Sequence, residues 1–414
     1  MQVISEKERL RLRALAMRQL ELSHCDYNKR LYKDWEAHGR MDLNARPMIT
    51  IEFLTFCDEF ITPMLECESE SARSLEWQLL HNIIPVENFG DDTIIRDYFG
   101  YSEGCNLLPF GLTVKRKESG GLGHSFIPQV CDLDEDFHLL GKSVIYTGGT
   151  NDSLICFVHD IIGDILPVKK IGNPIYSGFL MSIVHIMGMD NMYTAMHTTP
   201  DLFSKMCSML ADDYIEMIEQ MESKGLFMAT NGDIGVCQGT MCFTDALPFE
   251  GTNLKASQIW GYMDAQEAQG ISPNMYHDLV YPHYKRISER FGLLSYGCCE
   301  AVDRFWEDIS AYKNLKKLSI SNWTDEKFIS EKLRDLQDIQ GRKIVYHRKP
   351  SPNYLGVSRE LDENAVRAHI RKSVQYTTGL TLEITQRDVY TVHCSAAKVA
   401  RYVQIIREEC EKKK

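Results

Sequence analysis

The spacing of apolar and polar residues divides the chain into parts with different expected structure. Residues 1–45 place leucines at helical intervals between arginines and glutamates, which predicts an N-terminal segment of one or two amphipathic helices that caps the main domain. Residues 46–53 alternate apolar and polar positions after a turn signal, which predicts a strand. A helix is expected to follow over residues 69–84.

From residue 165 onward, short apolar runs alternate with longer helical stretches. The expected strands are 165–171, 225–230, 257–263, 293–299, 317–321, 343–347 and 380–386, and the clearest helices are 202–224, 273–290 and 364–375. Such alternation is typical of parallel βαβ units. Together with the strand near Met48 the strands number eight, which predicts an α/β fold, a (β/α)8 TIM barrel. An open doubly wound sheet is the alternative, but no G-x-G-x-x-G sequence follows a strand to support dinucleotide binding.

The stretch from about residue 90 to about residue 165 has a different character. It contains glycine pairs at 120–121 and 148–149 and an acidic loop at 132–136, which indicates an elaborated surface insertion. The expected organisation is therefore an N-terminal helical segment over 1–45, followed by a barrel domain over 46–414 that carries this insertion.

The amino-acid composition bears on which partners and which cellular compartment we expect. The 58 acidic residues outnumber the 46 basic ones, and lysines and arginines cluster only at the C-terminus, so we expect no nucleic-acid partner. The 13 cysteines are irregularly spaced without a C-x-x-C pair, which argues against a disulfide framework or a zinc ribbon and favours the reducing cytoplasm. No apolar run is long enough for a membrane span and no signal peptide is recognisable, so we expect no membrane partner.

Polar residues follow several of the expected strands, where a barrel has its active site. Because these strand ends meet at one site in a barrel, we expect side chains from several strand ends to bind the substrate. The predicted binding residues are Trp260, Asp264, Trp323, His347, Lys349 and Arg387.

The richest of these strand ends is the segment 296–300, which reads Tyr-Gly-Cys-Cys-Glu. If the strand continued through it, Tyr296, Cys298 and Glu300 would share one face and Cys299 would point towards the helices. A phenol, a thiol and a carboxylate on one face can move protons or bind a metal ion. The alternative is that both cysteines are ordinary core residues, because cysteine is among the most buried residue types.

Several segments together carry a resemblance to a known family. They are 273–287, 296–300, 314–321, 348–352 and 387–391. In their order the chain, from about Arg46 onward, resembles the uroporphyrinogen decarboxylase superfamily, whose (β/α)8 barrels include cobamide-dependent methyltransferases and cobalamin-independent methionine synthase. The resemblance is to a branch found in anaerobic bacteria.

Two departures from that superfamily bear on the activity. True uroporphyrinogen decarboxylases have an arginine-rich segment after the first strand, whereas this chain has the acidic and apolar segment 53–60, which would repel a substrate with eight carboxylates. The zinc methyltransferases carry H-x-C where this chain has Tyr296-Gly297-Cys298, and a second cysteine near Asp388. The resemblance therefore leaves zinc open, with Cys298 and Glu300 as its ligands, beside a metal-free site that uses Glu300, Tyr296 and Asp388 as acid groups.

These observations predict a corrinoid-dependent methyltransferase. It would demethylate a small methyl donor, such as a methoxyaromatic compound, and pass the methyl group to a corrinoid (cobalamin) on a partner protein. The alternatives are a decarboxylase or lyase that clamps a small carboxylated substrate with Arg348 and Lys349, and a non-catalytic barrel that binds a corrin or another tetrapyrrole. Whether the chain forms a homodimer is left open.

Overall fold

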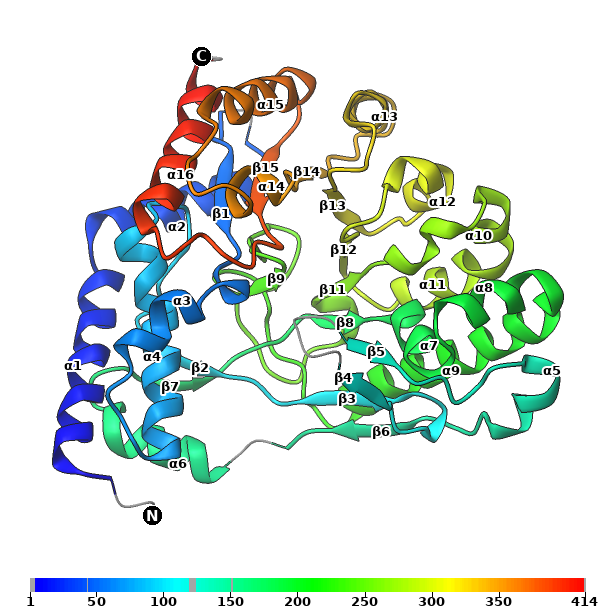
Figure 1. Cartoon of the computed structure of the whole chain (residues 1–414), viewed down its shortest axis with the longest axis horizontal. Coiled ribbons are helices and arrows are strands. Elements are labelled where there is room, and N and C mark those ends of the chain that lie inside the picture. Colours follow the sequence, from blue (N-terminus) through cyan, green and yellow to red (C-terminus); the bar gives the residue numbers. More distant parts are fainter. Residues whose placement is uncertain (1–3, 43, 119–123, 150–151, 413–414) are drawn as a thin grey trace.

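A parallel β-sheet organises the computed structural model, which describes residues 4–42, 44–118, 124–149 and 152–412. Within these ranges its seven strands hydrogen-bond in the order β1 (Met48–Ile51), β15 (Leu382–Gln386), β14 (Val345–Arg348), β13 (Leu315–Ile320), β12 (Leu293–Tyr296), β11 (Trp260–Met263) and β8 (Ile175–Ser177). Every pair is parallel, so all the carboxyl ends lie at one edge of the sheet. Figure 1 shows the strands running through the middle of the molecule.

Helices alternate with these strands. They are α3 (Asp58–Ile61) and α4 (Glu70–Asn88) after β1; α7 (Phe179–Met187), α8 (Met189–Thr198) and α9 (Pro200–Ser223) after β8; α10 (Pro273–Leu279) and α11 (Tyr281–Ser288) after β11; α12 (Trp306–Ser310) after β12; α13 (Glu326–Gln340) after β13; α14 (Asn353–Gly356) and α15 (Glu363–Tyr376) after β14; and α16 (Ala396–Glu411) after β15. Local chemistry sets their ends: Asp325 caps α13 by accepting from the amide of Phe328, and Gly341 ends it in the left-handed conformation.

Shorter elements complete the chain. The single-turn 3-10 helices are η1 (Phe53–Thr55), η2 (Thr62–Met64), η3 (Pro109–Gly111), η4 (Phe137–Leu139), η5 (Ala256–Gln258), η6 (Gln266–Gly270) and η7 (Val302–Phe305). The region predicted as an insertion contains β2 (Phe99–Tyr101), β3 (Cys105–Leu108), β4 (Arg116–Glu118), β5 (His124–Phe126), α5 (Leu133–Asp136), β6 (Val144–Thr147) and α6 (Asp152–Ile162). Apart from β2, its strands pair among themselves as β3 with β6 and β4 with β5, so the described residues of this region add no strand to the central sheet.

The predicted N-terminal helices are confirmed as α1 (Glu6–Ser23) and α2 (Asp26–Gly39). A capping box starts α1, in which Ser5 and Glu8 bond each other reciprocally. The buried side of α1 packs along α4, and α2 places the buried Trp35 beside Phe243. Among the described helices none combines the length and the apolar character that crossing a bilayer requires.

Of the eight strands predicted for the barrel, one lies outside the central sheet and one is wrong. Residues 168–170 form β7, which pairs with β2 outside the central sheet, and 225–230 contribute only one isolated bridge, between Met228 and Thr252. The sheet strand in this part of the chain is β8, which the sequence did not predict because three residues, Ile-Tyr-Ser, are too short to show a period. The α/β class with a large parallel sheet is confirmed, while the described residues show no hydrogen-bonded closure between β1 and β8.

A hairpin covers the inner face of the sheet near this opening. It consists of β9 (Gly235–Cys237) and β10 (Thr240–Met241), and it packs with Trp260 of β11 in a small core separate from the main one between sheet and helices. Lys317 on β13 donates to the carbonyl of Met241 at 2.7 Å and pairs with Glu383 on β15 at 3.1 Å. Both partners of this ion pair are buried, and the positive charge of Lys317 helps to lower the pKa of Glu383 to about 2 despite the opposing effect of burial.

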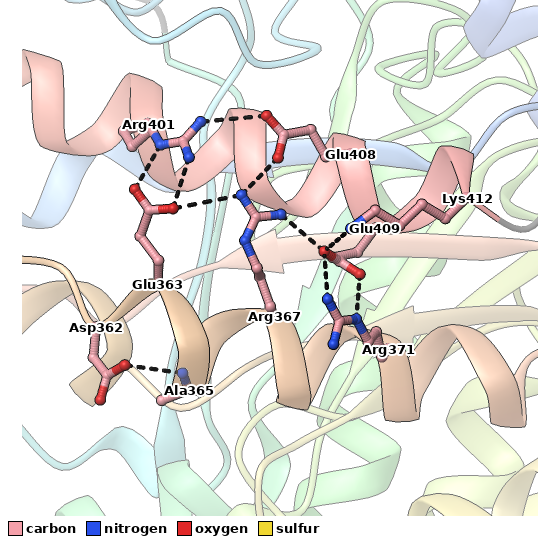
Figure 2. Close-up of polar contacts among 9 residues, drawn as sticks. All are labelled: Asp362, Glu363, Ala365, Arg367, Arg371, Arg401, Glu408, Glu409 and Lys412. Atoms are coloured by element: carbon pink, nitrogen blue, oxygen red, sulfur yellow. Dashed lines mark hydrogen bonds and ion pairs between the residues drawn. The ribbon is translucent and has the colours of Figure 1, made fainter.

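Figure 2 shows how the last helix is attached. Arginines on α15 and α16 alternate with glutamates across the seam between the two helices, and each Arg367 amino group donates to a carboxylate of α16, with Glu409 at 2.8 Å and Glu408 at 2.6 Å. Glu409 is fully buried and also accepts from Arg371. Because several charges share partners, this network holds its geometry better than isolated surface pairs do.

We expect Lys317→Met to lower the free energy of unfolding by about 3–5 kcal/mol, because it leaves Glu383 buried without its partner. Urea unfolding monitored by circular dichroism measures the loss. The double variant Lys317→Met/Glu383→Gln is expected to recover part of it, since no uncompensated charge remains. Arg9→Met, which breaks a half-exposed pair with Asp160, is the control and should cost less than about 1 kcal/mol. Equal losses in the single variant and the control would contradict this role.

Candidate active site

The loops after four central strands bring together polar side chains that the sequence predicted. Asp264 follows β11, residues 298–300 follow β12, Lys349 follows β14, and Arg387 and Asp388 follow β15. A direct contact joins two of these loops, because Arg387 Nη1 lies 3.0 Å from Cys298 Sγ. The carboxyl edge of the sheet is therefore a convergent polar site, as the parallel strands require.

The loop after β12 leaves the strand direction at Gly297, whose φ of +99° suits glycine. Glu300 then folds back, so that one carboxylate oxygen accepts from the amide of Ala265 at 2.9 Å and the other from the amide of Cys298 at 2.7 Å. Ser319 on β13 donates to the carbonyl of Cys298. The carboxylate of Glu300 thus shapes the loop, with both of its oxygens already bonded.

The two cysteines lie side by side, which corrects the prediction that Cys299 points towards the helices. Their sulfur atoms are 3.5 Å apart, and Cys299 Sγ is also 3.5 Å from Asp388 Oδ2. The hydrogen bond with Cys299 and the positive charges of Lys349 and Arg387 lower the pKa of the Cys298 thiol to about 5, against the opposing effect of burial. The same hydrogen bond raises the pKa of Cys299, so the pair holds one thiolate and one thiol.

Opposite the thiolate lies a group of carboxylic acids. Asp264 accepts hydrogen bonds from Tyr262 at 3.0 Å and from Tyr176 at 3.2 Å. Burial, followed by the charges of Glu300 and Cys298, raises the pKa of Asp264 well above its usual value. Burial also raises the pKa of Glu300. These carboxyl groups are therefore protonated in a pH range where an exposed aspartate or glutamate is charged.

Glu267 is a functional candidate that the sequence reading missed. It lies in η6, three residues beyond Asp264, and its Oε2 is buried without a hydrogen-bond partner among the described residues. Burial, with smaller contributions from Glu300 and Cys298, raises its pKa to about 7. A carboxyl group with this pKa and a free oxygen can give or take a proton at neutral pH. The signal that could have found it is the acidic residue in the turn that follows Asp264.

A cavity of about 680 Å³ opens beside these groups. One wall is apolar and comes from α7 with Met181 and Val184, from the start of α8 with Met189 and from β5 with Phe126. The other wall comes from η6, with Gln266, Glu267 and Gln269, and from Cys299 of the candidate site, and Trp323 also lines the cavity, with 75% of its surface exposed. The cavity therefore presents a largely apolar ligand to a carboxylic acid and a thiol.

Of the predicted site residues, Trp323 alone is part of the cavity lining. Three others also lie away from the convergent strand ends. Tyr296 is fully buried, and its hydroxyl bonds that of Tyr276 on α10, on the helix side of the sheet. Trp260 starts β11 at its amino end and donates to the carbonyl of Cys242 at 2.9 Å. His347 bonds Thr385 within the sheet, and burial lowers the pKa of its imidazole to about 3. The face alternation expected for 296–300 was thus wrong, because the strand ends at Tyr296.

The two residues predicted to clamp a carboxylate, Arg348 and Lys349, lie in different surroundings. Arg348 is buried and pairs with Glu326 at 3.1 Å, while it donates to the carbonyls of Ile320 and Ser321. It therefore supports the sheet. Lys349 points into the site instead: only 4% of it is exposed, and its Nζ has no hydrogen-bond partner in the described part of the chain.

The side chains predicted to bind zinc do not form a suitable ligand set. The described residues contain no group of three or more histidine, cysteine, aspartate or glutamate side chains placed to hold a metal ion. The guanidinium of Arg387 contacts Cys298 Sγ, and both carboxylate oxygens of Glu300 accept backbone amides. A zinc site needs about four donors around the metal, so this arrangement does not support the zinc prediction.

Comparisons with known proteins give likenesses in structure but none in sequence. No protein-family model matches the chain, and none of the curated proteins matches it. Among solved structures, a methyltransferase from Methanosarcina mazei is similar to 91% of this chain and 98% of its own, with 10% sequence identity and a TM-score of 0.47. A likeness at this level says nothing about the reaction that this chain performs.

The raised pKa of Glu267 predicts a pH-dependent contribution to stability. Between the ordinary pKa of a glutamate and about 7 the unfolded chain loses this proton before the folded chain does, so the contribution is complete at low pH and is lost as the pH rises through about 7. Glu267→Gln keeps the group neutral. We therefore expect the variant to gain stability relative to the wild type as the pH rises, by up to roughly 3 kcal/mol. Chemical unfolding from about pH 5 to about pH 8 measures this, and a pH-independent difference would contradict it.

Proposed function

We propose that this chain is a methyltransferase that removes a methyl group from a small, largely apolar compound and delivers it to a corrinoid on a separate protein. The observation that carries the proposal is the position of Glu267. Glu267 lines a largely apolar cavity, its Oε2 is buried without a hydrogen-bond partner among the described residues, and its pKa is raised to about 7. Demethylation of an ether or an amine requires such an acid, because a bare alkoxide, phenolate or amide anion leaves poorly.

The residues of the cavity would divide the work. Met181 and Val184 of α7 would hold the apolar part of the methyl donor and exclude water around it. Glu267 would protonate the leaving oxygen or nitrogen, and Asp264, kept neutral by burial, would maintain the acidic wall. A reduced corrinoid, when bound, supplies the metal centre that accepts the methyl group.

The surface around the site suits a protein partner. Large apolar side chains are exposed in segments that follow four strands of the sheet and within the last strand, β8, and one of them, Trp323, lines the cavity. They are Leu54 after β1, Tyr176 in β8, Trp323 after β13, Val357 after β14 and Tyr390 after β15. Exposed apolar residues at the mouth of a site are typical of an interaction surface, and an aromatic ring such as Trp323 could stack on a corrin face.

Lys349 favours a second candidate, a lyase acting on a small carboxylated substrate. Its buried ammonium group lacks a hydrogen-bond partner among the described residues, and a substrate carboxylate would supply one. Lys349→Met would then raise the KM for carboxylated substrates at least tenfold, a loss of about 1.4 kcal/mol of binding. Release of carbon dioxide from small carboxylic acids measures this activity. Equal KM values for the variant and the wild type would exclude the carboxylate role of Lys349.

The first candidate is tested with the purified protein, reduced cobalamin and a panel of methoxyaromatic compounds and methylamines. Methylcobalamin formation is followed by absorption. We expect a donor-dependent rate in the wild type and a decrease of roughly 10²–10⁴-fold in Glu267→Gln, because the general acid is lost. The loss should be smallest for donors whose leaving group is already stable as an anion.

Glu289→Gln is the matched control, since Glu289 is an exposed carboxylate at the end of α11, away from the cavity. It should leave the rate unchanged. The absence of methylcobalamin with every donor would overturn the proposed methyl transfer. A donor-dependent rate that Glu267→Gln leaves intact would overturn the role of Glu267.

A further inference from the structure

The pair Cys298 and Cys299 has a geometry that methyl transfer does not use. Cys299 lines the cavity, so small solutes reach it, and its sulfur lies 3.5 Å from that of Cys298. All 13 cysteines are free thiols, but several are fully buried or isolated at the surface. Cys298 is only 5% exposed and lies behind Cys299, outside the cavity lining. The pair differs from the other cysteines, because a small molecule that reacts with Cys299 brings its sulfur next to a second thiol.

The surroundings favour a thiolate at Cys298. Arg387 Nη1 lies 3.0 Å from its sulfur, and the charge of the buried Lys349 acts on it as well. Neighbouring cations are the usual means by which proteins keep a cysteine nucleophilic near neutral pH. On the other side of the pair, Cys299 Sγ lies 3.5 Å from Asp388 Oδ2, a carboxylate oxygen that can accept the thiol proton.

We propose that Cys298 and Cys299 form a redox-active dithiol that exchanges with low-molecular-weight disulfides. Cys299, which lines the cavity, passes its proton to Asp388 and attacks one sulfur of the disulfide RSSR, which forms a mixed disulfide Cys299–S–S–R and releases RS⁻. The Cys298 thiolate then attacks the sulfur of Cys299, which closes a disulfide between the two cysteines and releases a second RS⁻. The protein loses two electrons, and the reagent gains them as two thiolates.

Closure of this bond would change the site reversibly. The Cα atoms of adjacent residues are about 3.8 Å apart, closer than the roughly 4.4–6.8 Å of ordinary disulfides. A strained disulfide of this kind is easily reduced, which suits a regulatory bond better than a structural one. Oxidation would also remove the thiolate that Arg387 contacts. The dithiol chemistry is independent of the proposed methyl transfer, and its test requires no methyl donor.

The experiment uses the full-length protein and hydroxyethyl disulfide as the probe, followed by acid quenching, alkylation and tryptic digestion. The tryptic peptide 291–304 contains Cys298 and Cys299 and no other cysteine. We expect this peptide to lose two hydrogen atoms and to resist alkylation in the wild type. In Cys298→Ser the mixed disulfide at Cys299 should persist, because the resolving thiol is gone. Cys394→Ser, which changes an exposed cysteine, is the matched control and should leave the peptide's oxidation unchanged.

Closure of the disulfide separates this site from an ordinary surface thiol. The peptide 291–304 should lose two hydrogen atoms, whereas the exposed Cys394, which bonds no other thiol among the described residues, should stop at the mixed disulfide. If both thiols of 291–304 remain free while Cys394 is modified, the proposal is wrong. It is also wrong if the wild-type peptide stops at the mixed disulfide, since Cys298 would then not resolve it. Because these readings come from the wild-type protein, they stand even if a variant fails to fold.

Discussion

The buried ion pair between Lys317 and Glu383 is the constraint on which the inner side of the sheet depends. Lys317 has three N–H donors, and it uses them on Glu383, on the hydroxyl of Thr240 and on the carbonyl of Met241, so one side chain ties β13 to β15 and to the hairpin. The hairpin in turn places Gln238, whose amide donates to Tyr262. Tyr262 donates to Asp264, so a chain of hydrogen bonds links the buried ion pair to the candidate site.

The site consists of an acidic half and a thiolate half that influence each other. The negative charge of Cys298 contributes to the raised pKa values of Asp264 and Glu267, while Arg387 and Lys349 stabilise that charge from the other side. In water at neutral pH a carboxyl group is charged and a thiol is neutral. In this site the order of the pKa values is reversed, because the loops after β11, β12 and β15 bury the carboxyl groups and place cations beside the thiol.

Residue patterns predicted the α/β class, most sheet strands and the convergence of strand ends, because these follow from hydrophobic period and from parallel topology. They failed where tertiary contacts override local pattern. The strand β8 is too short to show a period, and the segment 225–230 is apolar without being paired in the sheet. Cys299 was misplaced because the chain turns at Gly297, and Glu267 was overlooked because its pKa arises from burial that only the folded structure creates.

The pairing of β1 with β15 joins residues more than three hundred positions apart, with Met48 beside Glu383 and Ile51 beside Gln386. During synthesis β1 therefore leaves the ribosome long before β15 is made. The backbone groups of β1 that bond β15 stay unpaired until almost the whole chain has been synthesised. Glu52 and Arg387, which follow these two strands and form an ion pair, come together only at that last step. A nascent chain that is truncated before β15 would lack one wall of the site, so the chemistry proposed for this protein belongs to the completed polypeptide alone.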